Sequence, residues 1–163
     1  MSRKVAYGGI LLGLNIILLL LVNVLPINTL FLLGLASLPL SIIIMEWGPK
    51  VGVIFYFGSV ILSFIVMANK SQWILYVFTF GIYGLIKYLI EKDRSIVVEY
   101  ALKIIVANIL VVVVYAILRF FIYIPVNFIT IGIFEVAFII YDYTYSLFID
   151  YYNDRLRKIT KMN

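Results

Sequence analysis

Three ionisable side chains interrupt long apolar runs in the last third of the chain: Arg119, Glu135 and Asp142. A charge at the centre of a bilayer costs on the order of 2.5 to 3.5 kcal/mol on insertion scales, so such groups turn toward the protein interior and take polar partners. Glu135 and Asp142 are seven residues apart, which places them on one face of a helix, two turns from each other. Arg119 and Glu135 predict recognition of a polar ligand or a coupling ion inside a membrane.

The apolar runs on either side of Pro125 predict a tight antiparallel helical hairpin, in which residues equally far from Pro125 share a depth. This places Tyr115 level with Glu135, and Arg119 about one helical turn above Glu135. We expect a substrate-binding site built from these three side chains and Asn127. The alternative is a structural ion pair, with an arginine that anchors the end of its helix at the interface.

Other polar and aromatic side chains have a less direct connection to this site. Asn108 lies level with Asp142, and Lys103 is close to both, so we expect a buried polar group with a structural role near the inner interface. Aromatic residues at the ends of the apolar runs are typical of an interfacial belt. Trp73, at the outer start of the fourth run, is also a candidate for the mouth of the binding site.

The elements that must position these residues are transmembrane helices. Of the 163 residues, 65% are hydrophobic and 13% are charged, whereas soluble domains are about half apolar and about a quarter charged. A helix needs roughly 20 apolar residues to cross the hydrocarbon. We predict an all-α membrane protein, a single domain over 1–163, with six transmembrane helices at about residues 5–25, 29–46, 51–68, 72–90, 101–123 and 128–149. The first run is long for a signal peptide, so we expect a retained helix.

The distribution of basic residues predicts the orientation of the bundle. With a cytoplasmic N-terminus, the outer side holds Lys70 and Arg119, and the other basic residues gather on the inner side. By the positive-inside rule both termini are cytoplasmic, and residues 154–163 form a basic tail against anionic head groups. The net charge of +5 is therefore a topology signal, and we expect the lipid bilayer, with no nucleic acid, as the partner of these charges.

The residue types argue against an enzyme. The sequence contains no Cys and no His, the usual metal ligands and nucleophile or base partners, so we expect no catalytic residues, no metal and no cofactor. No phosphate-binding Gly-x-x-x-x-Gly-Lys-Ser/Thr motif occurs, so any ATP hydrolysis must come from another subunit.

A strip of small residues runs along the first helix: Ala6, Gly9 and Gly13. Small residues at this spacing let a second helix approach closely in a membrane. The strip indicates either contact with a partner helix or packing within the chain's own bundle.

With these features the sequence resembles the substrate-binding S components of prokaryotic energy-coupling factor (ECF) transporters. The resemblance is carried by the basic start that leads into Ala6, Gly9 and Gly13, by Gly48-Pro49-x-x-Gly52 at the start of the third helix, and by six spans in a short chain. It covers nearly the whole chain in layout. The family's strip is typically Ala-x-x-x-Ala, and here glycines occupy the similar positions.

The resemblance implies a multi-pass protein of a prokaryotic plasma membrane that binds a small molecule, such as a vitamin, in its outer half. It also implies a transmembrane coupling subunit, which meets the small-residue strip, and ATPase subunits that supply energy. The chain is similar in size and span number to MreD-type membrane proteins as well, which implies the alternative of a scaffolding protein without a ligand. An ion-coupled carrier that acts alone would need a continuous polar path, which the sequence shows only in fragments.

Overall fold

The fold is known from a computed structural model that describes residues 2–25, 28–92, 94–121 and 127–156. Every regular element within these residues is a helix. Six helical stretches there are long and apolar enough to cross a membrane, which confirms the predicted helical membrane fold. They run over Lys4–Val24, Thr29–Trp47, Pro49–Val66, Lys70–Glu91, Ile96–Leu118 and Ile129–Arg155.

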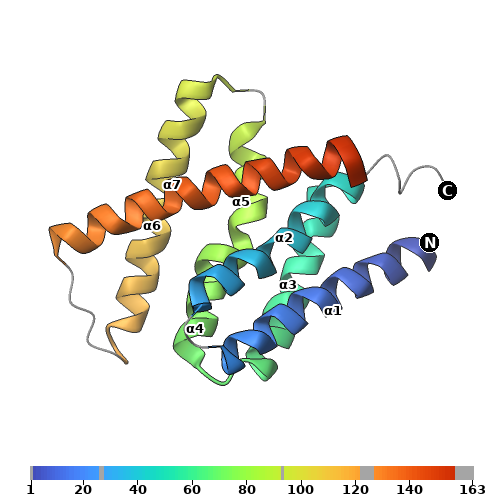
Figure 1. Cartoon of the computed structure of the whole chain (residues 1–163), viewed down its shortest axis with the longest axis horizontal. Coiled ribbons are helices and arrows are strands. Elements are labelled where there is room, and N and C mark those ends of the chain that lie inside the picture. The colour runs from blue at the N-terminus through green and yellow to red at the C-terminus, as the bar shows by residue number, and fades with distance from the viewer. Residues whose placement is uncertain (1, 26–27, 93, 122–126, 157–163) are drawn as a thin grey trace. The chain divides into compact units, whose positions relative to one another are not determined.

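The chain divides into two compact units, Met1–Ile124 (unit 1) and Pro125–Asn163 (unit 2). Unit 1 holds α1 (Ser2–Val24), α2 (Thr29–Trp47), α3 (Pro49–Val66), α4 (Lys70–Leu75), the π-helical segment η2 (Tyr76–Gly81), α5 (Ile82–Glu91) and α6 (Ile96–Leu118). Unit 2 holds α7 (Phe128–Tyr151) and the π-helical segment η3 (Tyr152–Leu156) (Figure 1). The single domain expected from the sequence stays a prediction.

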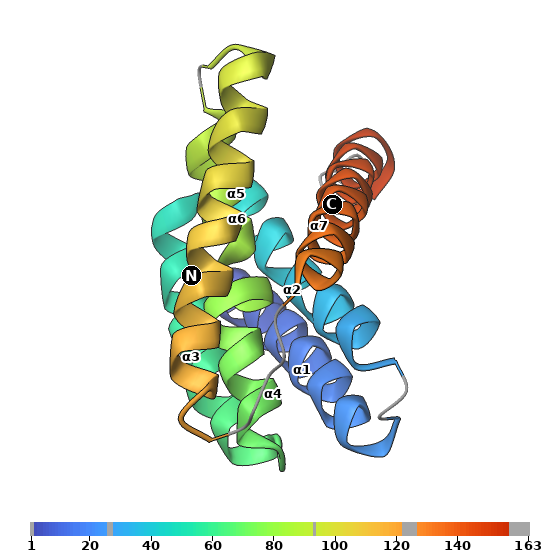
Figure 2. The same cartoon turned by 90° about the vertical axis from the view of Figure 1, so that its left-hand side faces the viewer.

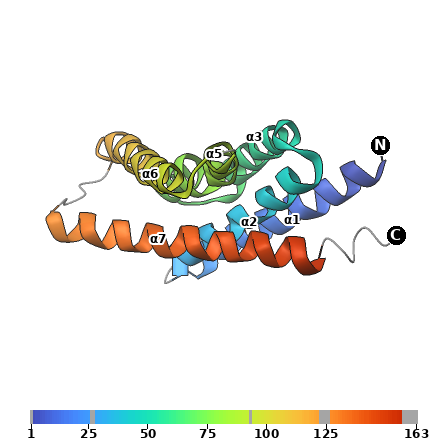
Figure 3. The same ribbon diagram turned by 90° about the horizontal axis from the view of Figure 1, so that it is seen from above.

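Within unit 1, consecutive helices are neighbours. α1, α2 and α3 pack against one another, and α5 packs against α2, α3 and α6. Figure 2 shows α6 running beside α5, and in the view from above α3, α5 and α6 follow one another in a row (Figure 3). The short connections predicted between the spans produce this arrangement.

The hydrophobic core of unit 1 lies where α1, α2, α3 and η2 meet. α1 contributes one narrow face, because Leu11, Asn15, Leu19 and Val22 are buried while most of its other side chains are exposed. The buried residues of this core are Leu19, Val22, Leu32, Leu33, Ala36, Met67, Tyr76 and Val77.

The fourth span is not the regular α-helix that the sequence predicted over 72–90. It begins as α4, where the Asn69 side chain accepts hydrogen bonds from the amides of Ser71 and Gln72, widens into η2, and continues as α5. The Tyr56 hydroxyl donates to the Val77 carbonyl across 3.0 Å and so holds the wide turn from α3. A Cβ atom at position 81 would lie only 3.0 Å from the Tyr76 carbonyl oxygen, so a glycine fits the end of this turn better than a residue with a side chain.

The bounds of α6 differ from the predicted 101–123 at both ends. α6 begins at Ile96, so Glu99 lies in its first turn, four residues before Lys103. The helix ends at Leu118, and Arg119 lies in the turn that follows instead of inside the span. An acidic residue in the first turn is favourable beside the positive end of the helix dipole, which explains the earlier start.

Candidate functional site

Three polar side chains meet in the middle of unit 1, each contributed by a different element. Asn15 of α1, Ser59 of α3 and Tyr76 of η2 are 1%, 1% and 2% exposed. The Asn15 amide nitrogen donates to the Tyr76 hydroxyl at 2.8 Å and to the Ala36 carbonyl of α2 at 2.5 Å. Ser59 donates to the Asn15 amide oxygen at 2.7 Å. We call this set of hydrogen bonds the Asn15 ring.

The direction of the remaining hydrogen bond of the ring, between Ser59 and Tyr76, follows from the number of protons available. The hydroxyls of Ser59 and Tyr76 lie 2.7 Å apart, and geometry alone allows either to donate. Because the single proton of Ser59 is directed to Asn15, the Tyr76 hydroxyl must donate to Ser59. Each of the three side chains therefore donates once and accepts once around a closed circuit. This arrangement suits a structural junction, because Ser59 faces an amide oxygen and not a general base.

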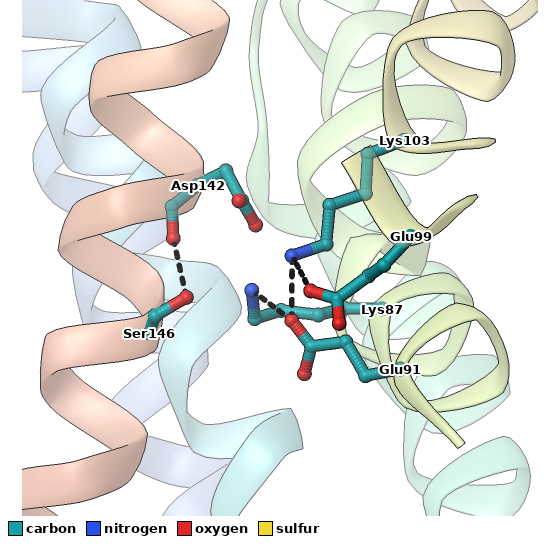
Figure 4. Close-up of polar contacts among 6 residues, drawn as sticks. All are labelled: Lys87, Glu91, Glu99, Lys103, Asp142 and Ser146. Carbon is teal, nitrogen blue, oxygen red and sulfur yellow. Dashed lines mark hydrogen bonds and ion pairs between the residues drawn. The ribbon is translucent and has the colours of Figure 1, made fainter. Parts of the chain in front are cut away.

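A second polar cluster joins α5 to α6 (Figure 4). Lys87 and Lys103 lie 2.5 Å and 2.6 Å from the same carboxylate oxygen of Glu91, and Lys103 lies 2.7 Å from Glu99. Lys103 is thus held by two carboxylates of unit 1. Its expected grouping with Asp142 of unit 2 stays a prediction. Two lysines and two glutamates balance in charge, which allows these groups to lie between the helices.

Among the predicted ligand-binding residues of unit 1, Trp73 has a clear packing role. Its indole nitrogen donates to the Val60 carbonyl at 3.3 Å, and its ring meets that of Phe64 edge to face with 5.0 Å between centroids. Arg119 is exposed in the turn after α6, and its backbone amide donates to the Tyr115 carbonyl at 2.9 Å. Trp73 is therefore partly buried and packs against the core of unit 1.

The predicted residues of unit 2 lie on α7. Asn127 caps this helix: its side chain accepts from the Thr130 amide at 2.8 Å, and its own amide donates to the Thr130 hydroxyl at 2.9 Å. Glu135 is half-buried about two turns after Asn127. Because Arg119 and Tyr115 belong to unit 1, their convergence with Glu135 and Asn127 stays a prediction.

The predicted buried polar pair is also divided between the units. The Asn108 side chain donates to the Ile104 carbonyl at 3.0 Å, within α6. In α7, Ser146 donates to the backbone carbonyl of Asp142 at 3.0 Å (Figure 4). The pairing of Asn108 with Asp142 stays a prediction.

Two of the hollows formed by the described residues are open and mainly apolar. One lies on α7 alone and is lined by Ile129, Gly132, Ile133, Val136, Ala137 and Ile140. The other lies between α3 and α5 and is lined by Pro49, Lys50, Val53, Ile82, Leu85, Ile86 and Leu89. Neither of these two hollows is lined by a residue of the predicted ligand site.

The small-residue strip on α1 is open. A Cβ atom added at Gly9 or Gly13 would meet no described atom within 4 Å, and Ala6 is exposed. The neighbouring Gly8 faces α2 instead, with its added Cβ 4.0 Å from Cδ1 of Ile43. Within unit 1, Gly9 and Gly13 therefore make no room for another described helix. Packing within the whole bundle stays an alternative to contact with a partner helix.

Gly52, part of the Gly-Pro-x-x-Gly sequence, has a packing role. A Cβ atom there would lie 2.6 Å from Cγ1 of Ile44 and 3.3 Å from Cδ2 of Leu85. Only glycine allows α3 to approach α2 and α5 this closely. Gly48 supplies the tight turn before α3, with a φ of 84° that L-residues with side chains rarely adopt.

Sequence reasoning missed the Asn15 ring, although the sequence contained part of its signal. Asn15 is a strong hydrogen-bonding side chain in the middle of a long apolar run, which calls for a partner inside the bundle. Its partners Ser59 and Tyr76 are ordinary residues of their helices until the fold brings them together. Comparison of the chain with protein-family models, curated proteins and solved structures finds no match.

Proposed function

We propose that this chain is a membrane-embedded subunit that docks onto a partner transmembrane helix through α1, and that it is the substrate-binding subunit of an ECF-type uptake transporter. The observation that carries the proposal is the open strip of Ala6, Gly9 and Gly13. Lipid chains gain little from a glycine groove, whereas a second helix gains close van der Waals contact along it.

In this proposal α1 begins at the cytoplasmic side of a prokaryotic plasma membrane, and the strip meets a transmembrane coupling subunit. Separate ATPase subunits supply the energy, in agreement with the lack of a phosphate-binding motif in this chain. The substrate is a small molecule such as a vitamin, held by Arg119, Tyr115 and Glu135. Trp73 and Asn127 take no part in this version of the site, because their side chains are engaged in packing and helix capping.

A second candidate is a scaffolding membrane protein of the MreD type. Its support is the buried Asn15 ring of unit 1, whose side chains satisfy one another, and the apolar character of the two hollows described above. A scaffold also needs a partner helix, so the strip on α1 serves both candidates. The two differ in the identity of the partner and in the presence of a ligand.

Co-purification tests the proposal. The affinity-tagged chain, extracted from its native membrane, should bring down ATPase subunits, and Gly9→Leu with Gly13→Leu should remove most of them by filling the strip. The matched control is Gly132→Leu on α7, where an added Cβ also meets no described atom within 4 Å. This control should retain the ATPase subunits.

Mass spectrometry of the extracted protein addresses the ligand. The parent should retain a small molecule that Arg119→Ala releases, while Lys70→Ala, an outer basic residue apart from the proposed site, should retain it. Recovery of cell-wall synthesis proteins without ATPase subunits, and without a small molecule, would favour the scaffold.

A further inference from the structure

The rotation of α1 about its own axis decides which way its small-residue strip faces. Inward packing of Leu11, Leu19 and Val22 gives this helix one buried face. In a membrane, however, apolar side chains have little preference between lipid and a neighbouring helix. The apolar surface of α1 is therefore a weak determinant of its rotation.

Asn15 is a strong determinant, because three elements converge on its one amide. The amide nitrogen reaches Ala36 of α2 and Tyr76 of η2, and the amide oxygen accepts from Ser59 of α3. Turning α1 in either direction would break all of these bonds and leave the buried polar groups unsatisfied, which is costly where water is absent.

The strip lies on the side of α1 away from this amide. With about 100° of rotation per residue, Ala6 and Gly13 lie about 180° and about 160° from Asn15, and Gly9 about 120° from it. A helix held by Asn15 against α2, α3 and η2 thus presents the strip outward, in agreement with the open space beside Gly9 and Gly13.

We propose that Asn15 is a positioning residue that fixes the rotation of α1 and thereby aims the strip of Ala6, Gly9 and Gly13 at the partner helix. The consequence for docking rests on the proposed function. The rotation itself is a property of this chain alone and can be measured without any partner.

Cysteine cross-linking measures the rotation, and the sequence has no native cysteine to interfere. A Cβ at Gly8 lies 4.0 Å from Cδ1 of Ile43, so residue 8 faces residue 43. The pair Gly8→Cys with Ile43→Cys, joined by a short bifunctional thiol reagent that replaces the length of the isoleucine side chain, therefore reports the native rotation. The pair Gly9→Cys with Ile43→Cys reports a helix turned by one residue, since a Cβ at Gly9 meets no described atom within 4 Å. In the full-length protein in native membranes, this reagent should cross-link the first pair far more than the second.

Asn15→Leu should lower the ratio of the two cross-linking yields several-fold toward one. The matched control is Asn23→Leu on the same helix, where the amide donates to the Val66 carbonyl at 2.9 Å and accepts from the Ala68 amide at 3.1 Å. This control should keep the parent ratio. Ser59→Ala, which removes one hydroxyl of the ring from α3, provides a milder second variant and should lower the ratio in the same direction.

The proposal is overturned if Asn15→Leu and Ser59→Ala both keep the parent ratio, or if Asn23→Leu lowers it as much as Asn15→Leu. If Asn15→Leu fails to accumulate in the membrane, Ser59→Ala decides alone. If Asn15→Leu lowers the ratio but the parent chain recovers no ATPase subunits, the result would support the role of Asn15 in rotation and contradict the proposed docking. If Asn15→Leu keeps the parent ratio while Gly9→Leu with Gly13→Leu loses the ATPase subunits, the result would support the proposed docking and contradict the role of Asn15 in rotation.

Discussion

The ammonium group of Lys103 lies 2.6 Å from the carboxylate of Glu91, so α6 is fastened to the last residue of α5 across the polar connection between them. Lys87, one turn earlier on α5, shares the same carboxylate oxygen at 2.5 Å. The Glu91 carboxylate therefore binds one lysine from each helix at the end of the α5–α6 hairpin.

Glu91→Gln should destabilise the protein by about 1.5 kcal/mol, the lower end of the range for hydrogen bonds to charged groups. The low end applies because the Glu91 side chain is 32% exposed and water compensates part of the loss. Unfolding in detergent micelles with increasing denaturant measures the effect. Glu99→Gln, which affects the pairing of Lys103, should cost less, and a Glu91→Gln protein as stable as the parent would contradict the role given to this carboxylate.

Tyr76→Phe removes the hydroxyl that accepts from Asn15 and donates to Ser59. Hydrogen bonds between membrane helices average about 0.6 kcal/mol and reach about 1.7 kcal/mol, so a loss of about 1 to 2 kcal/mol is expected when two are broken. Asn15→Leu combined with Tyr76→Phe should cost less than the sum of the single changes, because both act on one ring. Additive costs in the same unfolding assay would show that the two residues are independent.

Gly52→Ala should destabilise the packing of α3 on α2 by about 1 to 3 kcal/mol, the usual cost of overfilling a core. The added carbon would lie 2.6 Å from Cγ1 of Ile44, a branched and buried side chain that has little room to move. In an Ile44→Ala background that carbon is absent, so the cost of Gly52→Ala should shrink or vanish. A cost that is the same in both backgrounds would locate the strain elsewhere.

Gly81→Ala should destabilise η2, because the new methyl group would meet the Tyr76 carbonyl oxygen at 3.0 Å and the Tyr76 ring at 3.2 Å. We expect a loss of about 1 to 3 kcal/mol. At Gly132, where no described atom lies within 4 Å, the same substitution should instead stabilise by up to about 1 kcal/mol through helix propensity. Thermal unfolding of the two variants side by side measures the contrast, which would be lost if Gly81 were an ordinary helical position.

Asn127→Ala should cost about 0.5 to 2 kcal/mol, because it removes a side-chain cap from α7. Asn127→Asp and Asn127→Ser, which retain an acceptor for the Thr130 amide, should keep most of the stability. Retention of bound small molecule, measured by mass spectrometry, should follow stability across the three variants. Loss of ligand in the stable Asn127→Asp and Asn127→Ser proteins would instead support the binding role first expected for this residue.

The sequence was sufficient to predict the transmembrane helices, because a span needs only length and low polarity. Their ends were harder to predict. The predicted fifth span begins at residue 101, whereas Glu99 and Lys103 are spaced to pair along one helix face, which indicates that the helix already includes both. Asn127 and Thr130 likewise have the spacing of a reciprocal helix cap, which indicates that α7 begins directly after Asn127.

Features that depend on tertiary contacts could not be predicted in this way. The wide turn of η2 depends on a hydroxyl from Tyr56, twenty-one residues before its acceptor Val77. The Asn15 ring brings together side chains from three separate elements, and neither Ser59 nor Tyr76 stands out by its own sequence surroundings. The direction in which Gly9 and Gly13 face also follows from how α1 packs, which a list of small residues leaves open.

The π-helical segment η2 has a consequence for how this protein tolerates insertions and deletions. A turn closed by bonds between residues five apart contains one residue more than an α-helical turn. Deleting one residue within Tyr76–Gly81 would convert the wide turn to a regular one and leave the orientation of α5 intact. The same deletion at the start of α5 would swing Glu91 by about 100° away from Lys103. In an evolutionary lineage of such chains, single-residue gaps in the fourth span should therefore collect in η2.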